Sequence, residues 1–301
     1  GFARGGEFDD LVLAAIALMI AAIPTAHPAI ATAILSKGSP MLAAAGAIVK
    51  QLRSVETLGS TSALNSDKTG TLTMNQMTAV AMSLAERRYT ITGTGYSTTG
   101  VITQAAGQTP VKLERFLVPM ALCSDAEVRD GELTGDPTEG ALVVLATKGG
   151  IDVDQTREAY PRVATLPFDA AYKLMATFHD WTDGSGKKVV RAYIKGSPNE
   201  LLKRAASIDG PDGKSLPVAQ LHDRYLAERD RMAKLGMRLM ATGIKDFDPA
   251  TFDPDADLLK AIEGLELLAL VGITDPPRPA AQAAIAQGQA AGMQILSLIH
   301  I

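Results

Sequence analysis

Residues 62–73 read SALNSDKTGTLT, a short apolar-to-polar stretch that runs into a glycine-containing loop. The first five residues are typical of a short buried strand, and Asp67 follows directly where that strand ends. Reactive groups of open α/β sheets usually lie where a strand passes into a loop. A carboxylate in such a place can attack a γ-phosphoryl group and form an acyl phosphate. Asp67 is therefore a candidate nucleophile.

The residues after Asp67 fit the same chemistry. Phosphoryl transfer to a carboxylate needs a magnesium ion to screen the approaching anions, with cationic or amide groups around the phosphoryl oxygens. Lys68, Thr69 and Thr71 can help with these tasks and are candidate catalytic residues. Asp67 and Thr69 are the candidate ligands for Mg²⁺.

Residues 11–35 contain no Asp, Glu, Lys or Arg. As one helix they would extend roughly 37 Å, enough to cross a hydrocarbon core of about 30 Å. Lys37, Lys50 and Arg53 follow, which predicts that the C-terminal side faces the cytoplasm. We therefore expect a transmembrane helix from about residue 10 to residue 35, with a buried helix of a soluble protein as the alternative.

Two prolines interrupt this expected helix. Pro24 and Pro28 remove backbone donors, so the helix should unwind between them. Transporters use the carbonyls freed at such breaks to coordinate cations, whereas a simple kink is the alternative. His27 favours a functional break, because an ionisable side chain at membrane depth is costly. The candidate ion-path residues are Pro24, Thr25, His27 and Pro28.

The rest of the chain mixes strands and helices with glycine turns. The pattern predicts strands at 166–168 and 189–194, a hairpin within 89–102, helices at 139–148 and 221–235, a strand at 265–273 and a helix at 276–291. The continuous apolar run at 265–273 is typical of a central parallel strand.

Composition excludes several classes of protein. The net charge of −4 argues against a nucleic-acid partner. A single cysteine, Cys123, excludes an internal disulfide framework, and the four histidines include no HExxH pair. The sequence also has no GxxxxGK[ST] motif, so a nucleotide would have to bind without a P-loop.

The seven residues DKTGTLT at 67–73 match, residue for residue, the phosphorylation motif of P-type ATPases. Further segments resemble this family in its own order: the proline-broken helix at 24–28, TGDPTEGAL at 134–142, PFD at 167–169 with KLM at 173–175, KGSP at 195–198, GMR at 236–238 and DPPR at 275–278. The resemblance covers the chain up to about Gln294 and is nearest to the branch of calcium, sodium and proton pumps.

The resemblance implies a site for ATP with Mg²⁺. It places Glu139 near the adenine, Phe168 stacked on the adenine, Lys195 in the nucleotide pocket and Arg238 facing a phosphate. The full set of expected nucleotide-binding residues is Glu139, Phe168, Lys173, Lys195, Gly196, Arg238, Asp275 and Arg278, the last two at the hinge into the phosphorylation domain. Simpler local interpretations exist: residues 136–139 and 197–200 are also helix-capping patterns, and Phe168 alone is typical of a core residue.

The expected fold is α/β and multidomain. A transmembrane helix and cytoplasmic stalk occupy residues 1–60. A split phosphorylation domain, haloacid-dehalogenase-like (Rossmann-like), comprises 61–74 and 266–301. An inserted α+β nucleotide-binding domain with an antiparallel sheet spans 75–265. Both ends look cut, and we expect the last six residues to be truncated or out of frame, so that the fragment is inactive alone.

The implied activity is ATP-driven cation transport by an integral membrane protein whose large domains are cytoplasmic. Its implied partners are the transported cation, the lipid bilayer, and the actuator and remaining transmembrane segments. The ion is not identified, because Thr25 stands where calcium-type members have an acidic residue. Two alternatives remain: a haloacid-dehalogenase-class phosphatase, although Thr69 replaces the second Asp usual in that class, and a non-catalytic ATP-binding module.

Overall fold

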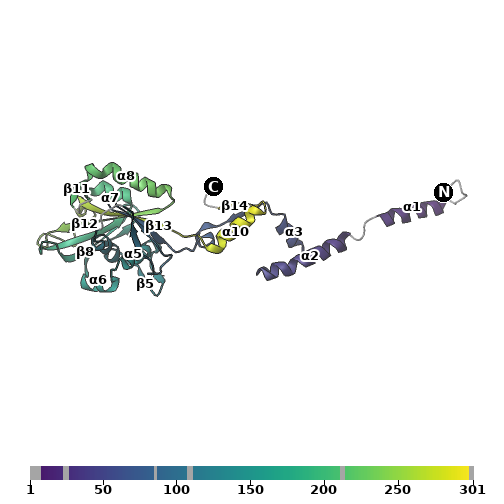
Figure 1. Cartoon of the computed structure of the whole chain (residues 1–301), viewed down its shortest axis with the longest axis horizontal. Coiled ribbons are helices and arrows are strands. Elements are labelled where there is room, and N and C mark those ends of the chain that lie inside the picture. Colours follow the sequence, from purple (N-terminus) through teal and green to yellow (C-terminus); the bar gives the residue numbers. More distant parts are fainter. Residues whose placement is uncertain (1–7, 23–26, 85–86, 107–110, 211–213, 298–301) are drawn as a thin grey trace. The chain divides into compact units, whose positions relative to one another are not determined.

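The computed structural model describes residues 8–22, 27–84, 87–106, 111–210 and 214–297 (Figure 1). The chain divides into two compact units. One unit comprises Gly1–Ser66 with Ala284–Ile301, and the other is Asp67–Ala283.

The described residues of the first unit form three helices and a pair of short strands. The helices are α1 (Phe8–Ala22), α2 (His27–Ala44) and α3 (Arg53–Gly59). Strand β1 (Ala63–Ser66) pairs in parallel with β14 (Gln294–Ser297), so two segments far apart in the sequence lie side by side. The expected strand before Asp67 is present, but its predicted burial is wrong. The side chains of β1 are mostly exposed, because within the described residues β1 pairs with β14 alone.

A transmembrane helix that unwinds at its prolines was expected over residues 10–35, and the described residues of that range belong to α1 and α2. Helix α1 has 15 residues and α2 has 18, with Pro28 in the first turn of α2 and Lys37 and Pro40 inside it. None of the helices in the described ranges is long and apolar enough to cross a membrane. The predicted unwound segment at Pro24 and Thr25 lies outside the described residues, as does the side chain of His27.

A large, mostly antiparallel sheet forms the second unit. Its main path runs in the order β4-β3-β2-β13-β12-β9-β8-β7, with β10 and β11 attached beside β13. The strands are β2 (Thr78–Leu84), β3 (Arg87–Ile91), β4 (Ile102–Gln104), β7 (Arg162–Asp169), β8 (Leu174–Thr182), β9 (Lys188–Gly196), β10 (Ala205–Asp209), β11 (Ser215–Pro217), β12 (Arg238–Phe247) and β13 (Leu265–Thr274), with β5 (Glu127–Arg129) and β6 (Glu132–Thr134) as a separate hairpin. The antiparallel sheet expected for the inserted domain is therefore confirmed.

Helices cover both faces of this sheet. Figure 1 shows α7 (Pro198–Arg204) and α8 (Val218–Lys234) on one side, with α5 (Pro137–Lys148) and α6 (Val153–Ala159) on the other. Helix α4 (Glu114–Leu122) belongs to the α5 side, where its buried residues pack with those of α5 in one core. A second core lies under α7 and α8. Two short helices remain, α9 (Leu258–Ala261) and α10 (Pro279–Ala290).

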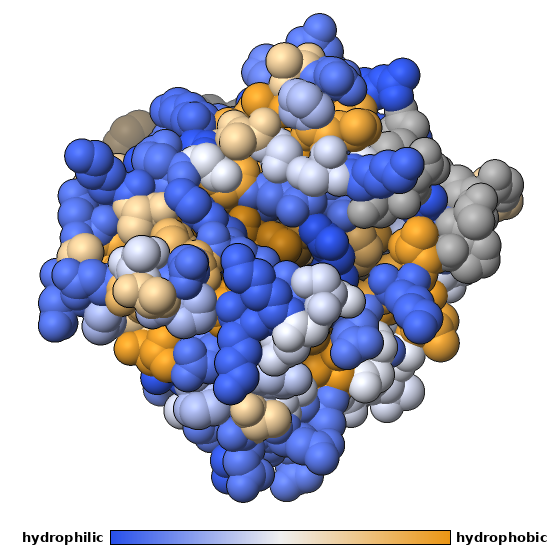
Figure 2. All heavy atoms as spheres, turned by 90° about the vertical axis from the view of Figure 1, so that its left-hand side faces the viewer, coloured by the Kyte–Doolittle hydropathy of each residue, from blue (hydrophilic) through white to orange (hydrophobic). Residues whose placement is uncertain are grey.

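Strand β13 corrects one prediction. Its position matches the apolar run at 265–273, but it pairs antiparallel with β12 and β2 and parallel only with β10. The run is apolar because both faces of the strand are covered by helices and their cores. Burial on both faces, rather than parallel pairing, explains the sequence pattern. Figure 2 shows that charged and polar side chains cover most of one outer face of the molecule, with hydrophobic side chains visible in a central hollow.

Candidate functional site

The residues after Asp67 form a wide turn, η2 (Lys68–Leu72), that is closed by Thr73. The N–H of Thr73 donates to the Lys68 carbonyl at 3.0 Å. The Thr73 hydroxyl accepts the Gly70 N–H at 3.3 Å. Gly70 has φ +77°, a left-handed conformation that glycine adopts without steric cost. The glycine of the motif is therefore required by the shape of the turn.

Asp275 and Arg278 hold this turn from a distant part of the chain. The Asp275 carboxylate accepts the Thr73 hydroxyl at 2.5 Å and the Gln76 N–H at 3.3 Å. The Arg278 guanidinium donates to the carbonyls of Thr73, at 3.0 Å, and Gly70, at 3.1 Å. Both residues were expected to bind nucleotide, and their described contacts lie on the turn that follows Asp67.

The four candidate catalytic side chains are open to solvent. Asp67 is extended, with φ −66° and ψ 146°, and is exposed together with Lys68, Thr69 and Thr71. Within the described residues, no group of three or more His, Cys, Asp or Glu side chains could hold a metal ion. Magnesium, however, is often bound by one or two carboxylates together with water and substrate phosphates. The oxygens of Asp67 and Thr69 fit that mode of binding.

Glu139 and Lys195 form a buried ion pair at the start of α5. Lys195, on β9, is 2% exposed, and its Nζ lies 2.7 Å from Oε1 of Glu139. The other carboxylate oxygen of Glu139 accepts the Asp125 N–H at 2.7 Å and the Ser124 hydroxyl at 3.1 Å. Both oxygens of this half-buried carboxylate thus have partners, as a charge withdrawn from water requires. Ser124 and Asp125 were not predicted from the sequence, because no local motif marks loop residues that contact Glu139 only after the chain has folded.

The N-terminus of α5 also binds Arg238. Asp136 caps the helix by accepting the N–H groups of Thr138 and Glu139, and Pro137 follows it, as the capping pattern predicts. The Arg238 guanidinium donates to the Thr138 hydroxyl at 3.0 Å. Contacts with α5 therefore bring together three of the predicted residues, Glu139, Lys195 and Arg238.

Phe168 is an exposed aromatic side chain rather than a core residue. It is 59% exposed near the end of β7. The pairing of β7 with β8 shifts register between Leu166 and Asp169, so Phe168 lies in an irregular part of the strand. An exposed ring at a fixed backbone position offers a flat apolar face that an aromatic ligand can stack on.

Lys173 and Gly196 meet where β8 begins beside the end of β9. The carbonyl of Lys173, a residue with φ +52°, accepts the Ser197 N–H at 2.9 Å. A Cβ on Gly196 would lie 2.6 Å from both the Lys173 carbonyl oxygen and the Leu174 Cβ. Only glycine allows this close approach. Ser197, the second predicted helix cap, starts α7 without a side-chain capping hydrogen bond.

Tyr96 links the two groups of predicted residues. Its side chain is 7% exposed, and its ring would lie 3.2 Å from a Cβ on Gly140 of α5. Burial raises the pKa of Tyr96, and the charges of Asp136 and Asp275 raise it further. Asp136 is the N-cap of α5, and Asp275 holds the turn that follows Asp67, so Tyr96 interacts with both regions.

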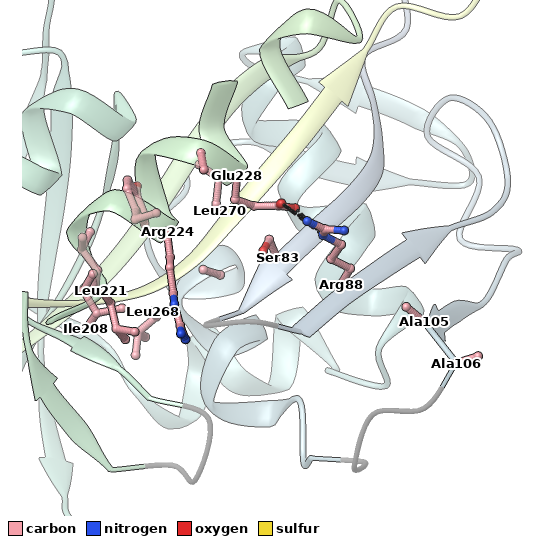
Figure 3. Close-up of a pocket in the computed structure, with 14 residues that line it drawn as sticks. Ser83, Arg88, Ala105, Ala106, Ile208, Leu221, Arg224, Glu228, Leu268 and Leu270 are labelled. Carbon is pink, nitrogen blue, oxygen red and sulfur yellow. Dashed lines mark hydrogen bonds and ion pairs between the residues drawn. The ribbon is translucent and has the colours of Figure 1, made fainter. Parts of the chain in front are cut away.

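A cavity of about 610 Å³ lies elsewhere, between α8 and the sheet (Figure 3). Leu268 and Leu270 of β13 form part of its floor, and the Arg88–Glu228 ion pair crosses its rim at 2.8 Å. None of the predicted nucleotide-binding residues lines this cavity. Its size is ordinary for a small-molecule site, but size alone does not place the chemistry.

Comparison with known proteins finds one matching family model and several related proteins. A family model described as "P-type ATPase, cytoplasmic domain N" matches residues 112–280. The chain is 36% identical over 310 aligned residues to "Cation-transporting ATPase pma1" of Synechocystis, an alignment that covers 98% of this chain and 33% of that protein.

Other relatives carry similar names. The "Calcium-transporting ATPase" of Bacillus subtilis is 33% identical, with 99% of this chain and 34% of that protein aligned. The mouse "Calcium-transporting ATPase type 2C member 1" is 31% identical, with 98% of this chain and 31% of that protein aligned. The chain thus spans about a third of the length of these relatives.

Proposed function

Since the chain belongs to the P-type ATPase family, we propose that it is the part of an ATP-driven cation pump that binds ATP and accepts its γ-phosphoryl group on Asp67. The observation that carries the proposal is the joint presence of the DKTGTLT turn and the Glu139–Lys195–Arg238 cluster in one compact unit.

ATP binds through the cluster at the start of α5. Phe168 supplies an exposed ring for the adenine, and the Glu139–Lys195 pair lies at the adenine end of the site. Lys173 and Arg238 are exposed cations that suit the phosphates. Gly196 keeps the strand ends close enough together to form the wall of the site.

Phosphorylation takes place on the turn after β1. An oxygen of the Asp67 carboxylate attacks the γ-phosphorus, the bond to the β,γ-bridging oxygen breaks, and ADP leaves. Lys68, Thr69 and Thr71 surround the phosphoryl oxygens. Asp67 and Thr69 would hold Mg²⁺, which would neutralise charge on the phosphates. Closure of the nucleotide-binding residues toward the turn brings the two reactants together.

Transport couples this step to the N-terminal helices. The apolar side chains of α1 and α2, among them Leu18 at 76% exposure and Ile34 at 66%, suit an apolar environment such as a bilayer or further helices. Pro24, Thr25, His27 and Pro28 contribute to the ion path. The names of the relatives favour a metal cation, and calcium is one candidate.

The test is phosphoenzyme formation by the pump that contains this chain. Membranes are incubated with γ-labelled ATP and Mg²⁺, quenched in acid, and compared across Ca²⁺, Na⁺, K⁺ and pH. We expect acid-stable label that one cation stimulates and that disappears in Asp67→Asn. Intact ATP binding with no label under any condition would instead indicate a nucleotide-binding module.

A further inference from the structure

Two arginines converge on the loop that follows α4. Arg157, on α6, donates to the carbonyls of Ala121 at 2.9 Å, Ser124 at 3.1 Å and Ala126 at 3.0 Å. Arg162 is the first residue of β7. It donates to the carbonyls of Leu122 at 3.3 Å and Ser124 at 2.7 Å and pairs with the Asp125 carboxylate at 2.6 Å.

These arginines donate hydrogen bonds to carbonyls at the C-terminal end of α4 that have no partner within the helix. Ala121 and Leu122 are the last residues of that helix, where carbonyls need partners from outside it. The two guanidiniums lie close together, since both donate to the Ser124 carbonyl. Burial first, and the charge of Arg162 second, lower the pKa of Arg157. Placing two cations side by side costs free energy, because like charges repel. Hydrogen bonds to the loop carbonyls and the ion pair with Asp125 offset that cost.

The same loop residues face Glu139 on their other side. The carbonyl of Ser124 accepts both guanidiniums, while its hydroxyl donates to Glu139 at 3.1 Å. The carboxylate of Asp125 binds Arg162, while its N–H donates to Glu139 at 2.7 Å. Both residues therefore connect an arginine to the carboxylate that holds Lys195.

We infer that Arg162, with Arg157, is a positioning residue for the nucleotide site: the two side chains fix the loop at 124–126 so that Ser124 and Asp125 orient Glu139 toward Lys195. The inference rests on the proposed function and adds residues to it that lie outside the ligand contacts. The arginines act on the adenine end of the site, where Glu139 lies, and leave the phosphate end at Arg238 unchanged.

The experiment titrates the chain with ATP and with AMP, and measures the Kd of Arg162→Met beside Arg162→Lys. We expect Arg162→Met to weaken both nucleotides by about tenfold, equivalent to losing roughly one charge-assisted hydrogen bond. The lysine variant keeps a cation for Asp125 but cannot reach two carbonyls, so it should restore part of the affinity. The matched control is Arg88→Met, which removes an exposed Arg88–Glu228 pair far from the loop along the sheet and should leave both Kd values unchanged.

A double-mutant cycle separates positioning from general destabilisation. In a Glu139→Gln background, Arg162→Met should change Kd by less than about twofold, because its effect is transmitted through Glu139. Ser124→Ala is a milder second variant that keeps both arginines, and we expect it to weaken ATP by about threefold. Circular dichroism verifies folding of every variant.

Two outcomes overturn the inference in different ways. If the unaltered chain binds ATP and folded Arg162→Met and Ser124→Ala bind it equally well, the arginines do not position the site and the proposed function stands. If the unaltered chain does not bind ATP or AMP, the nucleotide site itself is wrong and the inference fails with it.

Discussion

The side-chain hydroxyl of Thr73 lies 2.5 Å from the carboxylate of Asp275, although 202 positions separate the two residues in the chain. Arg278 reinforces the contact, because its backbone N–H donates to the Leu72 carbonyl at 2.9 Å while its guanidinium holds the Thr73 carbonyl. These contacts join the segment before β2 to the segment after β13, so the two ends of the chain portion from residue 76 to residue 274 are held together. The shape of the turn at 68–73 thus depends on the segment that follows β13.

The contacts of Asp275 with Thr73 and Gln76 predict that Asp275→Ala loosens the backbone of the turn. The change removes the acceptor of the Thr73 hydroxyl and of the Gln76 N–H, so the backbone around the turn should open more often. Hydrogen exchange measured by mass spectrometry should show about tenfold faster exchange of amides in residues 70–76. Asp183→Ala is the control, because Asp183 bonds only within its own exposed hairpin turn in the described contacts. Equal rates of amide exchange in the Asp275 variant and the parent would show that Asp275 does not order the turn.

The Glu139–Lys195 pair predicts strong coupling in stability. Lys195→Met removes the cation that pairs with the half-buried Glu139 carboxylate. The change should lower the free energy of unfolding by about 3–5 kcal/mol. Adding Glu139→Gln removes the unpaired charge, so the double variant should be less destabilised than the sum of the single changes. Urea denaturation of the four proteins tests the cycle. Strictly additive losses would mean that the two side chains do not interact in solution.

Phe168 and Phe178 provide a matched pair of aromatic substitutions. Phe168 is 59% exposed on β7, whereas Phe178 is fully buried on the neighbouring β8. Phe168→Ala should weaken ATP binding by about tenfold, through loss of a stacking surface, and change stability little. Phe178→Ala should instead cost about 3–5 kcal/mol of stability by opening a cavity. Unaltered ATP affinity in Phe168→Ala would remove this ring from the site.

Asp209 predicts a pH dependence of stability. It is 3% exposed on β10, and burial raises its pKa to about 6, with Arg115 and Arg87 opposing the shift and Glu266 adding to it. The folded pKa lies above that of the unfolded chain, so the folded state binds the proton more tightly. Below about pH 4 the carboxyl of Asp209 is protonated in both states and does not lower the free energy of unfolding. As pH rises from about 4 to about 6, the unfolded chain loses the proton first, and the folded state becomes less stable.

The Asp209→Asn variant measures this cost. The free energy of unfolding of the variant, minus that of the parent, should rise by on the order of 1–3 kcal/mol between pH 4 and pH 7. Thermal or urea unfolding at several pH values gives the difference directly. A difference that stays constant over this range would place the carboxylate in a more hydrated environment than β10 provides.

Local patterns predicted the elements of the second unit well. The helix expected at 139–148 is α5, and the helix expected at 221–235 is α8, both with bounds shifted by a few residues. The hydrophobic periodicity and the capping residues of these segments are local properties, so they are readable without the fold. The resemblance carried by DKTGTLT also predicted the family correctly.

Contacts between distant segments were not readable in this way. Residues 136–139 read as a capping box, yet Glu139 binds Lys195 and the loop after α4, because packing of α5 on the sheet brings them together. The sequence around Phe168, taken alone, predicted a core residue. Its side chain is instead exposed, because β7 pairs irregularly with β8 at this point. The apolar run at 265–273 indicated burial but not strand direction, so antiparallel pairing of β13 was missed.

The placement of ATP tests the central claim most directly. The chain, labelled with ¹⁵N, is titrated with ATP while backbone amide shifts are followed by NMR. We predict that the shifts that change gather around Phe168, Lys195, Gly196 and the first turn of α5. Changes gathered instead around Leu268 and Leu270, in the cavity beneath α8, would contradict the account and move the ligand site to the other face of the sheet.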